Sequence, residues 1–462
     1  MPVADDDSLI DFYPYRDRFR TYHRLEAEGR DRQSILDELA TMAAEEDRIA
    51  DRGRVSGSIY HGDHDHYRFL AEAFRLFAHA NVLQRDMYPS ATKLEAEIVA
   101  MTAAMLHGSE RVCGVVTFGG TESLINPMLV YRDRGRAEKG ITKPEVIIPI
   151  TAHVALDKAA HLLGIKLLKA PLGDDWRVDA EWVRDHVNQN TVAIVGSAPN
   201  YAHGMIDPID ALSDIALEHD IGLHVDGCLG GFILPWGERL GYPIPKFDFR
   251  VPGVTSISAD THKYGYSLKG TSVLLYRTPE LRKYQYFTNP DWPGGIYFSP
   301  GLSGSRSGGV VAAAWAAMVS LGEKGYLEVA DAIFKTAAEI RQGVEAIPEL
   351  EVIGDPTFLV AFRARELDIF HVNDHLIAKG WRLNALQLPP ALHFCVTRPN
   401  TAPGVAGAFV ADLREAVEYA KHPARESPKS GALYGLGGTP AGNEILDTLF
   451  SAALDAMYEV AP

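Results

Sequence analysis

The chain has 462 residues, 46% of them hydrophobic and 23% charged, which is enough for one large soluble domain and at least one smaller one. Its formal net charge of −16 argues against nucleic acid as a partner, and an anionic substrate would need a local cationic pocket. The three cysteines, Cys113, Cys228 and Cys395, are widely spaced and odd in number. They form no disulfide framework or zinc pattern and favour a reducing compartment.

The N-terminal residues give no targeting signal. Residues 1–8 are acidic and lack the basic and apolar regions of a signal peptide. No uncharged apolar run reaches the roughly 18 residues that a membrane-spanning helix needs. We therefore expect a cytoplasmic protein with no membrane span.

The first predicted elements are helical. Residues 1–55 are highly charged and helix-prone, and 32–46 have the pattern of an amphipathic helix. A glycine-containing segment, 56–60, leads into the histidine and aspartate cluster at 61–66. Alternating ligands of this kind can bind metal, but the cluster lacks the spaced ligands of a structural zinc site. We expect a solvated loop here and no metal.

From residue 93 onward, helix and strand patterns alternate, which is typical of α/β units around a mostly parallel sheet. The predicted strands are 112–117, 145–150, 192–196, 222–226, 255–258 and 272–276, and the predicted helices are 93–106, 119–134, 154–164 and 310–329. We divide the chain into an N-terminal helical segment (1–80), a large domain (81–330) and a smaller C-terminal α+β domain (331–462). Ligands bind at the carboxyl ends of the strands in such folds.

Two strand ends carry the residue types that pyridoxal 5'-phosphate (PLP) chemistry needs. Asp226 ends one strand, and His262 and Lys263 follow another. A lysine amine can form a Schiff base with the cofactor aldehyde, and an aspartate can keep the pyridine nitrogen protonated. Each residue alone has an ordinary interpretation, a cap or turn for Asp226 and a surface position for Lys263. Together they predict a PLP site.

Two glycine-containing turns could bind phosphate. Gly120 and Thr121 lie between a strand and a helix, where backbone N–H groups and the helix dipole favour an anion. Gly304 and Ser305 lie in the polar loop 303–309, whose backbone could also donate to a phosphate. The alternatives are an ordinary tight turn and a plain domain connector.

Two further residues have open interpretations from the sequence alone. His153 follows the strand 145–150, where an imidazole could stack on a cofactor ring or cap a helix. Lys269 lies six residues after Lys263 and could anchor a substrate anion or remain a solvated loop charge.

Several blocks, in this order, resemble the family of sphingosine-1-phosphate lyases, PLP enzymes of fold-type I that are related to the group II amino-acid decarboxylases. The blocks are His224-Val-Asp-Gly-Cys-Leu-Gly-Gly-Phe232, Val254-Thr-Ser-Ile-Ser-Ala-Asp-Thr-His-Lys-Tyr-Gly-Tyr266, Asp291-Trp-Pro-Gly-Gly-Ile-Tyr297 and Pro389-Pro-Ala-Leu-His-Phe-Cys395. The resemblance extends from about residue 55 to near the C-terminus and implies a PLP-dependent transferase-like large domain. The family's eukaryotic members carry an N-terminal membrane anchor, so the chain resembles the soluble microbial forms.

The resemblance assigns roles to residues of this chain. It implies that Lys263 forms the Schiff base, Asp226 pairs with the pyridine nitrogen and His153 stacks on the ring. It further implies cofactor-phosphate contacts from Gly120, Thr121 and His262, contacts from Gly304 and Ser305 of a second subunit in a homodimer with a shared site, catalytic roles for Tyr60 and Tyr201, and substrate-phosphate binding by Tyr60 and Lys269.

One position departs from the family pattern. The chain has Gln84 where the family commonly has a histidine, and glutamine cannot act as a general base. Either Gln84 only forms hydrogen bonds, or proton transfer falls to Tyr60, Tyr201 or a phosphate oxygen.

The implied reaction is a retro-aldol cleavage of the C2–C3 bond of sphingosine 1-phosphate or a related phosphorylated sphingoid base. Its products are a long-chain aldehyde and phosphoethanolamine. Two alternatives remain, a PLP-dependent amino-acid decarboxylase and a non-catalytic protein of the same fold that acts by binding. The run ending at Lys269 favours the lyase, and the presence of Lys263, Asp226 and His153 argues against a non-catalytic protein.

Overall fold

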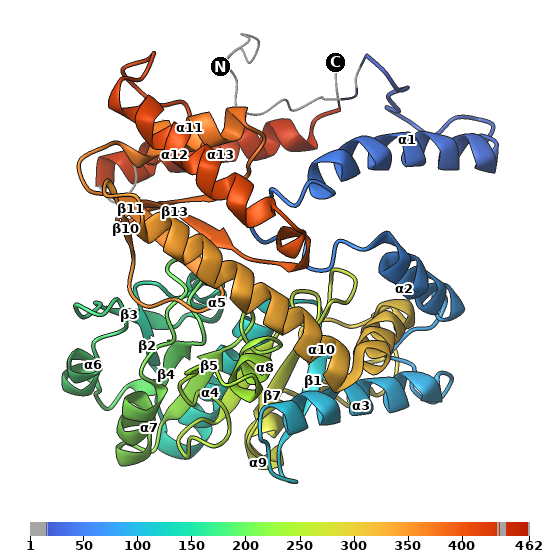
Figure 1. The fold of residues 1–462 in the computed structure, drawn as a ribbon. Coiled ribbons are helices and arrows are strands. Elements are labelled where there is room, and N and C mark those ends of the chain that lie inside the picture. The colour runs from blue at the N-terminus through green and yellow to red at the C-terminus, as the bar shows by residue number, and fades with distance from the viewer. Residues whose placement is uncertain (1–14, 16, 432–433, 435–439, 461–462) are drawn as a thin grey trace.

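The computed structural model describes residues 15, 17–431, 434 and 440–460. Figure 1 shows a larger lower part around a central sheet and a smaller upper part that carries the C-terminal helices. The long helix α10, Gly308–Glu345, runs diagonally between the two. The acidic residues 1–8, from which we expect no signal peptide, lie outside the described residues.

The central sheet has seven strands in the order β1-β7-β6-β5-β4-β2-β3. The strands are β1 (Cys113–Thr117), β2 (Glu145–Pro149), β3 (Lys166–Ala170), β4 (Thr191–Ser197), β5 (Gly222–Asp226), β6 (Ser256–Ala259) and β7 (Ser272–Tyr276). Strands β3, β2, β4, β5 and β6 pair in parallel, and β7 is antiparallel to both β6 and β1. The expected α/β fold with a mostly parallel sheet is confirmed.

Helices cover both faces of this sheet (Figure 1). Those before α10 are α1 (Arg32–Ala50), α2 (His64–Leu76), α3 (Pro89–Met105), α4 (Gly120–Lys139), α5 (Ala155–Leu163), α6 (Ala180–His186), α7 (Ile209–Glu218), α8 (Leu234–Arg239), α9 (Pro279–Arg282) and the 3₁₀ turn η1 (Lys283–Gln285). Side chains of Asp31, Asp63 and Asp179 accept hydrogen bonds from the first N–H groups of α1, α2 and α6, which fixes where these helices begin.

Side chains of the central strands alternate between two hydrophobic cores, as the period of a strand requires. In β4, Ala193 and Val195 belong to the core that includes residues of α4 and α5. Between them, Ile194 belongs to the opposite core, which continues into α10 and the C-terminal part. The sheet is therefore buried on both faces. A binding site can form at the ends of the strands, where the loops lie.

The C-terminal part is an α+β unit, as expected. Its four antiparallel strands lie in the order β10-β11-β13-β12, namely Leu350–Val352, Leu359–Ala364, Pro390–Cys395 and Asn384–Gln387. It also contains α11 (Ile369–Ala378), the 3₁₀ turn η2 (Arg398–Thr401), α12 (Val405–Lys421) and α13 (Pro440–Tyr458), and a separate hairpin joins β8 (Phe287–Asn289) to β9 (Tyr297–Ser299). Residue 55 forms a β-bridge with Arg382, so the chain before the large sheet packs on this part. The division at residues 80 and 330 stays a prediction, and residue 330 lies inside α10.

The expectation of a solvated loop at residues 61–66 is wrong. His61 is only 6% exposed, and its ring stacks on His66 with 3.7 Å between centroids. Helix α2 begins at His64, and the backbone carbonyl of Tyr266 lies 2.7 Å from His66 Nε2. The Asp63 carboxylate caps α2 and His66 Nε2 faces a backbone carbonyl, so these two groups are already engaged. Among the described residues, no three histidine, cysteine, aspartate or glutamate side chains are placed to hold a metal ion.

No helix within the described ranges combines the length and the apolar character that crossing a lipid bilayer requires.

Candidate functional site

The candidate residues follow the carboxyl ends of neighbouring strands. Asp226 ends β5, and the loop with Lys263 follows β6. Gly120 follows β1, His153 follows β2 and Tyr201 follows β4. Because β1 and the parallel strands point the same way, these ends meet at one edge of the sheet. The structure thus gathers residues that lie far apart in the sequence.

Lys263 lies in a closed loop between β6 and β7. The Tyr266 N–H donates to Lys263 O at 2.9 Å, and the Thr261 hydroxyl donates to Thr271 Oγ1 at 2.7 Å across the base of the loop. The Lys263 side chain is 22% exposed, and its Nζ lies 3.0 Å from Oδ2 of Asp260. The loop therefore fixes the amine beside a buried carboxylate.

Asp260 is a candidate site residue that the sequence interpretation missed. It is 1% exposed and also lies 3.6 Å from His262 Nε2. Burial alone would raise the pKa of Asp260, but Lys263 and His262 outweigh it and lower this pKa. Burial likewise would lower the pKa of Lys263, but Asp260 raises it above its usual value. A signal was present, since Asp260 directly follows a buried strand three residues before the lysine.

We expect Asp260→Asn to lower the pKa of Lys263, because the buried ammonium loses its counter-charge. An opposite charge at this distance typically shifts a pKa by about one to three units. Mass spectrometry of cofactor-free protein treated with acetic anhydride across a pH range would measure this, and Lys263 should become reactive at lower pH. Asp214→Asn, an exposed aspartate on α7, is the control. An unchanged labelling midpoint in Asp260→Asn would contradict the assignment.

Asp226 is buried at the end of β5, with one oxygen already in use. Its Oδ1 accepts the Cys228 N–H at 3.0 Å and the Ser258 hydroxyl at 3.4 Å. His224 continues this buried network, with Nε2 3.4 Å from Ser258 Oγ. No donor among the described residues reaches Asp226 Oδ2. This oxygen suits a ring N–H, the partner that a protonated pyridine would supply.

The turn before α4 forms a narrow cradle beside Lys263. A Cβ added at Gly120 would lie 2.8 Å from Asp260 Oδ2 and 3.1 Å from Cys228 Sγ. Gly119 has φ +116°, and a Cβ there would lie 3.1 Å from His262 Cε1. Only glycine fits this close approach. The first N–H groups of α4, including that of Thr121, have no partner within the helix, so an anion can bind there.

His262 and His153 are each held by one ring nitrogen. His262 Nδ1 accepts the Thr271 N–H at 3.2 Å, and burial lowers the pKa of this imidazole. His153 Nδ1 accepts the Ala155 N–H at 3.1 Å, while the residue itself remains exposed. His153 therefore helps to cap α5, the ordinary interpretation, and keeps an open ring face that a cofactor ring could cover.

Tyr60 and Lys269 lie together near Lys263. The Lys269 ammonium is 4.6 Å from the centroid of the Tyr60 ring and donates to Ser58 O at 2.9 Å. Partial burial first, and the nearby Lys263 charge second, lower the pKa of Lys269 to about 8. Tyr60 is 9% exposed and packs edge-on against Tyr264. The structure thus places a second cation, Lys269, beside Tyr60.

Tyr201 is more open than Tyr60. It is 47% exposed, and its ring packs edge-on against His393 with 4.7 Å between centroids. Burial raises the pKa of both phenols above the ordinary tyrosine value, while the charge of Lys263 opposes this in each. Both phenols are therefore protonated near neutral pH, which suits them to donate hydrogen bonds and not to accept a proton.

Gly304, Ser305 and Gln84 do not join this cluster within one chain. Ser305 is exposed and its Oγ accepts from Asn81 Nδ2 at 3.0 Å. Gln84 is also exposed and is tied through its N–H to Asn81 O at 3.0 Å. Among the described residues, no hydrogen bond connects these three to the loop of Lys263.

The arrangement fits PLP. It offers an amine for the aldehyde, a buried carboxylate oxygen for the ring nitrogen and a glycine cradle with open N–H groups for the phosphate. The residues at these three positions are Lys263, Asp226 and Gly120, with His153 available to cover the ring. A second cation, Lys269, lies close enough to Lys263 for the two charges to interact.

Comparisons with known proteins agree with this geometry. The family described as "Pyridoxal-dependent decarboxylase conserved domain" matches residues 57–365. A sphingosine-1-phosphate lyase of Arabidopsis thaliana is 46% identical over 419 residues, covering 88% of this chain and 76% of that one.

Two solved structures are similar at different levels. A sphingosine-1-phosphate lyase of Burkholderia pseudomallei K96243 has a TM-score of 0.91 at 52% identity, covering 97% of this chain and 99% of that one. A glutamate decarboxylase of Lactobacillus brevis has a TM-score of 0.76 at 20% identity, covering 90% of this chain and 99% of that one, and it shows the shared fold alone.

Proposed function

The chain belongs to the pyridoxal-dependent decarboxylase family and, within it, to the sphingosine-1-phosphate lyases, and on this premise we propose its reaction. It is a PLP-dependent carbon–carbon lyase that cleaves the C2–C3 bond of phosphorylated sphingoid bases. The products are a long-chain aldehyde and phosphoethanolamine.

One observation carries the choice of lyase over decarboxylase. Lys269, at the far end of the loop that holds Lys263, lies over the Tyr60 ring at 4.6 Å with its pKa lowered to about 8. A cation held there can bind the substrate's phosphate in a protein whose net charge is −16. A decarboxylase needs no phosphate site for its substrate.

We propose the following cofactor contacts. Lys263 would hold the aldehyde carbon, Asp226 would keep a proton on the pyridine nitrogen, and His153 would cover the ring. Gly120 and Thr121, with His262, would bind the cofactor phosphate. When bound, PLP supplies an electron sink for the carbanion left on the substrate after the C2–C3 bond breaks.

The remaining residues would orient the substrate and move its proton. Lys269 and Tyr60 would hold the substrate phosphate and so fix which bond faces the ring. Gln84 has no basic group, and Tyr60 and Tyr201 are protonated. We propose that an oxygen of the substrate phosphate accepts the 3-hydroxyl proton, because this group is dianionic near neutral pH. The two phenols are placed to donate hydrogen bonds along this path.

We further propose a homodimer with a shared site. Gly304 and Ser305 are partly or fully exposed and make no hydrogen bond to the Lys263 loop of their own chain, which supports a role in the partner's site. A cytoplasmic location is also part of the proposal. Its support is the three cysteines, which are all unpaired.

Lys269 gives the reaction a defined pH dependence. Its ammonium is charged below pH 8 and neutral above it, so phosphate binding should weaken as the pH rises through about 8. We expect kcat/KM for a phosphorylated sphingoid base to fall there, since this parameter reports the free enzyme. Lys269→Arg should remove this alkaline limb, because arginine stays charged. Lys269→Met should lower kcat/KM at least about tenfold, the value of one charged hydrogen bond. An alkaline limb that persists unchanged in Lys269→Arg would contradict this role.

A substrate panel tests the proposed function. Purified protein with PLP would receive a phosphorylated sphingoid base, the same base without phosphate, and a set of amino acids. Aldehyde and carbon dioxide are both measured. Aldehyde from the phosphorylated base alone supports the lyase. Carbon dioxide from an amino acid without aldehyde supports a decarboxylase, and no turnover in a protein that binds no PLP supports a non-catalytic protein.

A further inference from the structure

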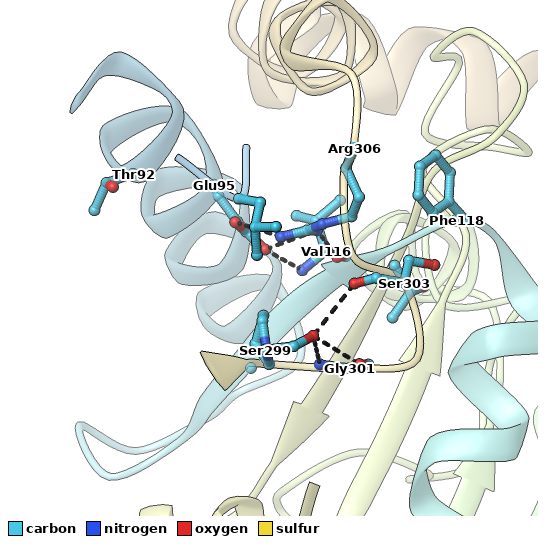
Figure 2. Close-up of polar contacts among 12 residues, drawn as sticks. Thr92, Glu95, Val116, Phe118, Ser299, Gly301, Ser303 and Arg306 are labelled. Atoms are coloured by element: carbon cyan, nitrogen blue, oxygen red, sulfur yellow. Dashed lines mark hydrogen bonds and ion pairs between the residues drawn. The ribbon is translucent and has the colours of Figure 1, made fainter. Parts of the chain in front are cut away.

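A buried ion pair links the start of the fold to the loop of Gly304 and Ser305. Glu95 on α3 is 5% exposed, and Arg306 is 9% exposed. The two terminal nitrogens of Arg306 each lie 3.3 Å from a different oxygen of Glu95, which makes a two-point contact (Figure 2). Such a contact fixes direction as well as distance.

The same pair completes the edge of the central sheet. Val116 lies on β1, an edge strand whose outward N–H and C=O groups have no neighbouring strand. Glu95 Oε1 accepts the Val116 N–H at 3.0 Å, and Arg306 donates to Val116 O. Figure 2 shows these contacts converging from α3, β1 and the loop. These contacts therefore fix the position of the loop relative to β1, the strand that leads to the turn at Gly120.

Backbone contacts extend this register to Ser305. The Arg306 N–H donates to Asn81 Oδ1 at 3.2 Å, and the Val82 N–H donates to Arg306 O at 2.9 Å. The same Asn81 side chain donates to Ser305 Oγ at 3.0 Å. On the other side, Ser299 Oγ donates to Gly301 O at 2.9 Å (Figure 2). These contacts hold the backbone of the loop in place, while the Ser305 side chain stays exposed.

A contribution to folding stability does not by itself explain why this ion pair is buried. Burying two charges costs free energy, and apolar replacements of buried ion pairs are often neutral or stabilising. Burial alone would raise the pKa of Glu95, but Arg306 and Arg85 outweigh it and lower this pKa, so the carboxylate is charged. What the pair supplies is a fixed position for the backbone of the loop.

We propose that Glu95 and Arg306 are positioning residues that set Gly304 and Ser305 for the cofactor phosphate in the partner subunit. This inference rests on the proposed shared site. Loss of the two-point contact should weaken cofactor binding in the neighbouring subunit and leave the variant's own Lys263 site intact when the partner's loop is native. Outer residues that orient the ligands of a metal site typically contribute about 10–100-fold in affinity, and we expect a loss on this scale here.

Mixed dimers test the proposal. A chain with Lys263→Ala and a chain with Arg306→Lys, carrying different tags, are co-expressed and purified through both tags. In the mixed dimer, one site combines the native Lys263 with a native loop from the other chain. Cofactor affinity of this site is measured as PLP fixed on Lys263 by borohydride against PLP concentration, which needs no turnover.

The expected result has two parts. Arg306→Lys homodimers should show an apparent Kd for PLP raised about tenfold or more, while the intact site of the mixed dimer keeps the wild-type Kd. Glu95→Gln, which keeps an acceptor for the Val116 N–H but removes the charge, should behave like Arg306→Lys. Arg250→Lys is the matched control, because Arg250 makes a two-point contact with Glu238, at 2.7 Å for each nitrogen, and contacts no residue of the loop.

Two outcomes would overturn the positioning role alone. One is a wild-type Kd in the Arg306→Lys homodimer. The other is a mixed dimer whose intact Lys263 site is as weak as in the Arg306→Lys homodimer, since the pair would then act within its own chain. A wild-type protein that binds PLP at full affinity as a monomer would overturn the shared site and this inference together.

Discussion

We expect Lys263→Ala to lower kcat for cleavage about 10⁴-fold or more. This is the scale seen when a covalent catalytic group is removed. The amine proposed to hold the cofactor aldehyde is gone, and we expect no other lysine in the described part of the chain to replace it. Lys269 is the nearest candidate, but it is engaged by Ser58 O at 2.9 Å and lies over the Tyr60 ring.

Borohydride treatment followed by peptide mass spectrometry measures this directly. Wild-type protein should carry PLP on the peptide that contains Lys263, and Lys263→Ala should carry none. Lys324→Ala, whose side chain is 89% exposed on α10, is the control and should behave as wild type. Retained aldehyde production, or PLP fixed on Lys269 in wild-type protein, would contradict the assignment.

Asp226→Ala should lower kcat about 10³-fold, the upper range for removal of one buried electrostatic contact. Asp226 has an oxygen, Oδ2, that no described donor reaches, and a protonated pyridine nitrogen is the proposed partner. Without the carboxylate the ring nitrogen loses its proton and the ring becomes a weaker electron sink.

A modified cofactor separates this role from a structural one. PLP methylated on the pyridine nitrogen carries a permanent positive charge, and alanine leaves room for the methyl group. It should restore part of the activity of Asp226→Ala and should lower that of wild-type protein, where the methyl group meets the carboxylate. If the methylated cofactor gives Asp226→Ala no gain over PLP, the ring-nitrogen role is wrong.

Much of the large domain could be predicted because most of its strands are short apolar runs that alternate with helical patterns. β5 and β7 have the predicted bounds, and β1, β2, β4 and β6 differ from theirs by one or two residues. The strand β3 was missed. Its sequence, Lys166-Leu-Leu-Lys-Ala170, lies at the sheet edge with both lysines exposed, so it lacks the apolar run of a buried strand.

The prediction of a solvated loop at residues 61–66 was wrong for a different reason. His61 and His66 have polar side chains, and the neighbouring residues in the sequence do not indicate that the two rings stack in a buried position. The stacking depends on Tyr266, whose ring centroid lies 5.3 Å from that of His61 across 205 residues of sequence. Contacts of that sequence separation exist only once the fold brings α2 beside the Lys263 loop.

The candidate site, too, could be predicted from the sequence only in part. Lys263, Asp226 and the Gly120 turn could be proposed from the sequence, because each follows a strand end. Asp260 was passed over although it stands in the same segment, since an aspartate after a strand is also common as a turn residue. The link between Glu95 and Arg306 could not be predicted, because it joins α3 to a loop about 200 residues later through the edge of the sheet.

Isotope labelling of the substrate identifies the bond that the protein cleaves. The protein with PLP is incubated with sphingosine 1-phosphate carrying ¹³C at C2, and all products are quantified by mass spectrometry. Cleavage of the C2–C3 bond predicts ¹³C-labelled phosphoethanolamine and unlabelled long-chain aldehyde in equal amounts. Recovery of intact labelled substrate, from protein that releases carbon dioxide from an amino acid under the same conditions, would contradict it.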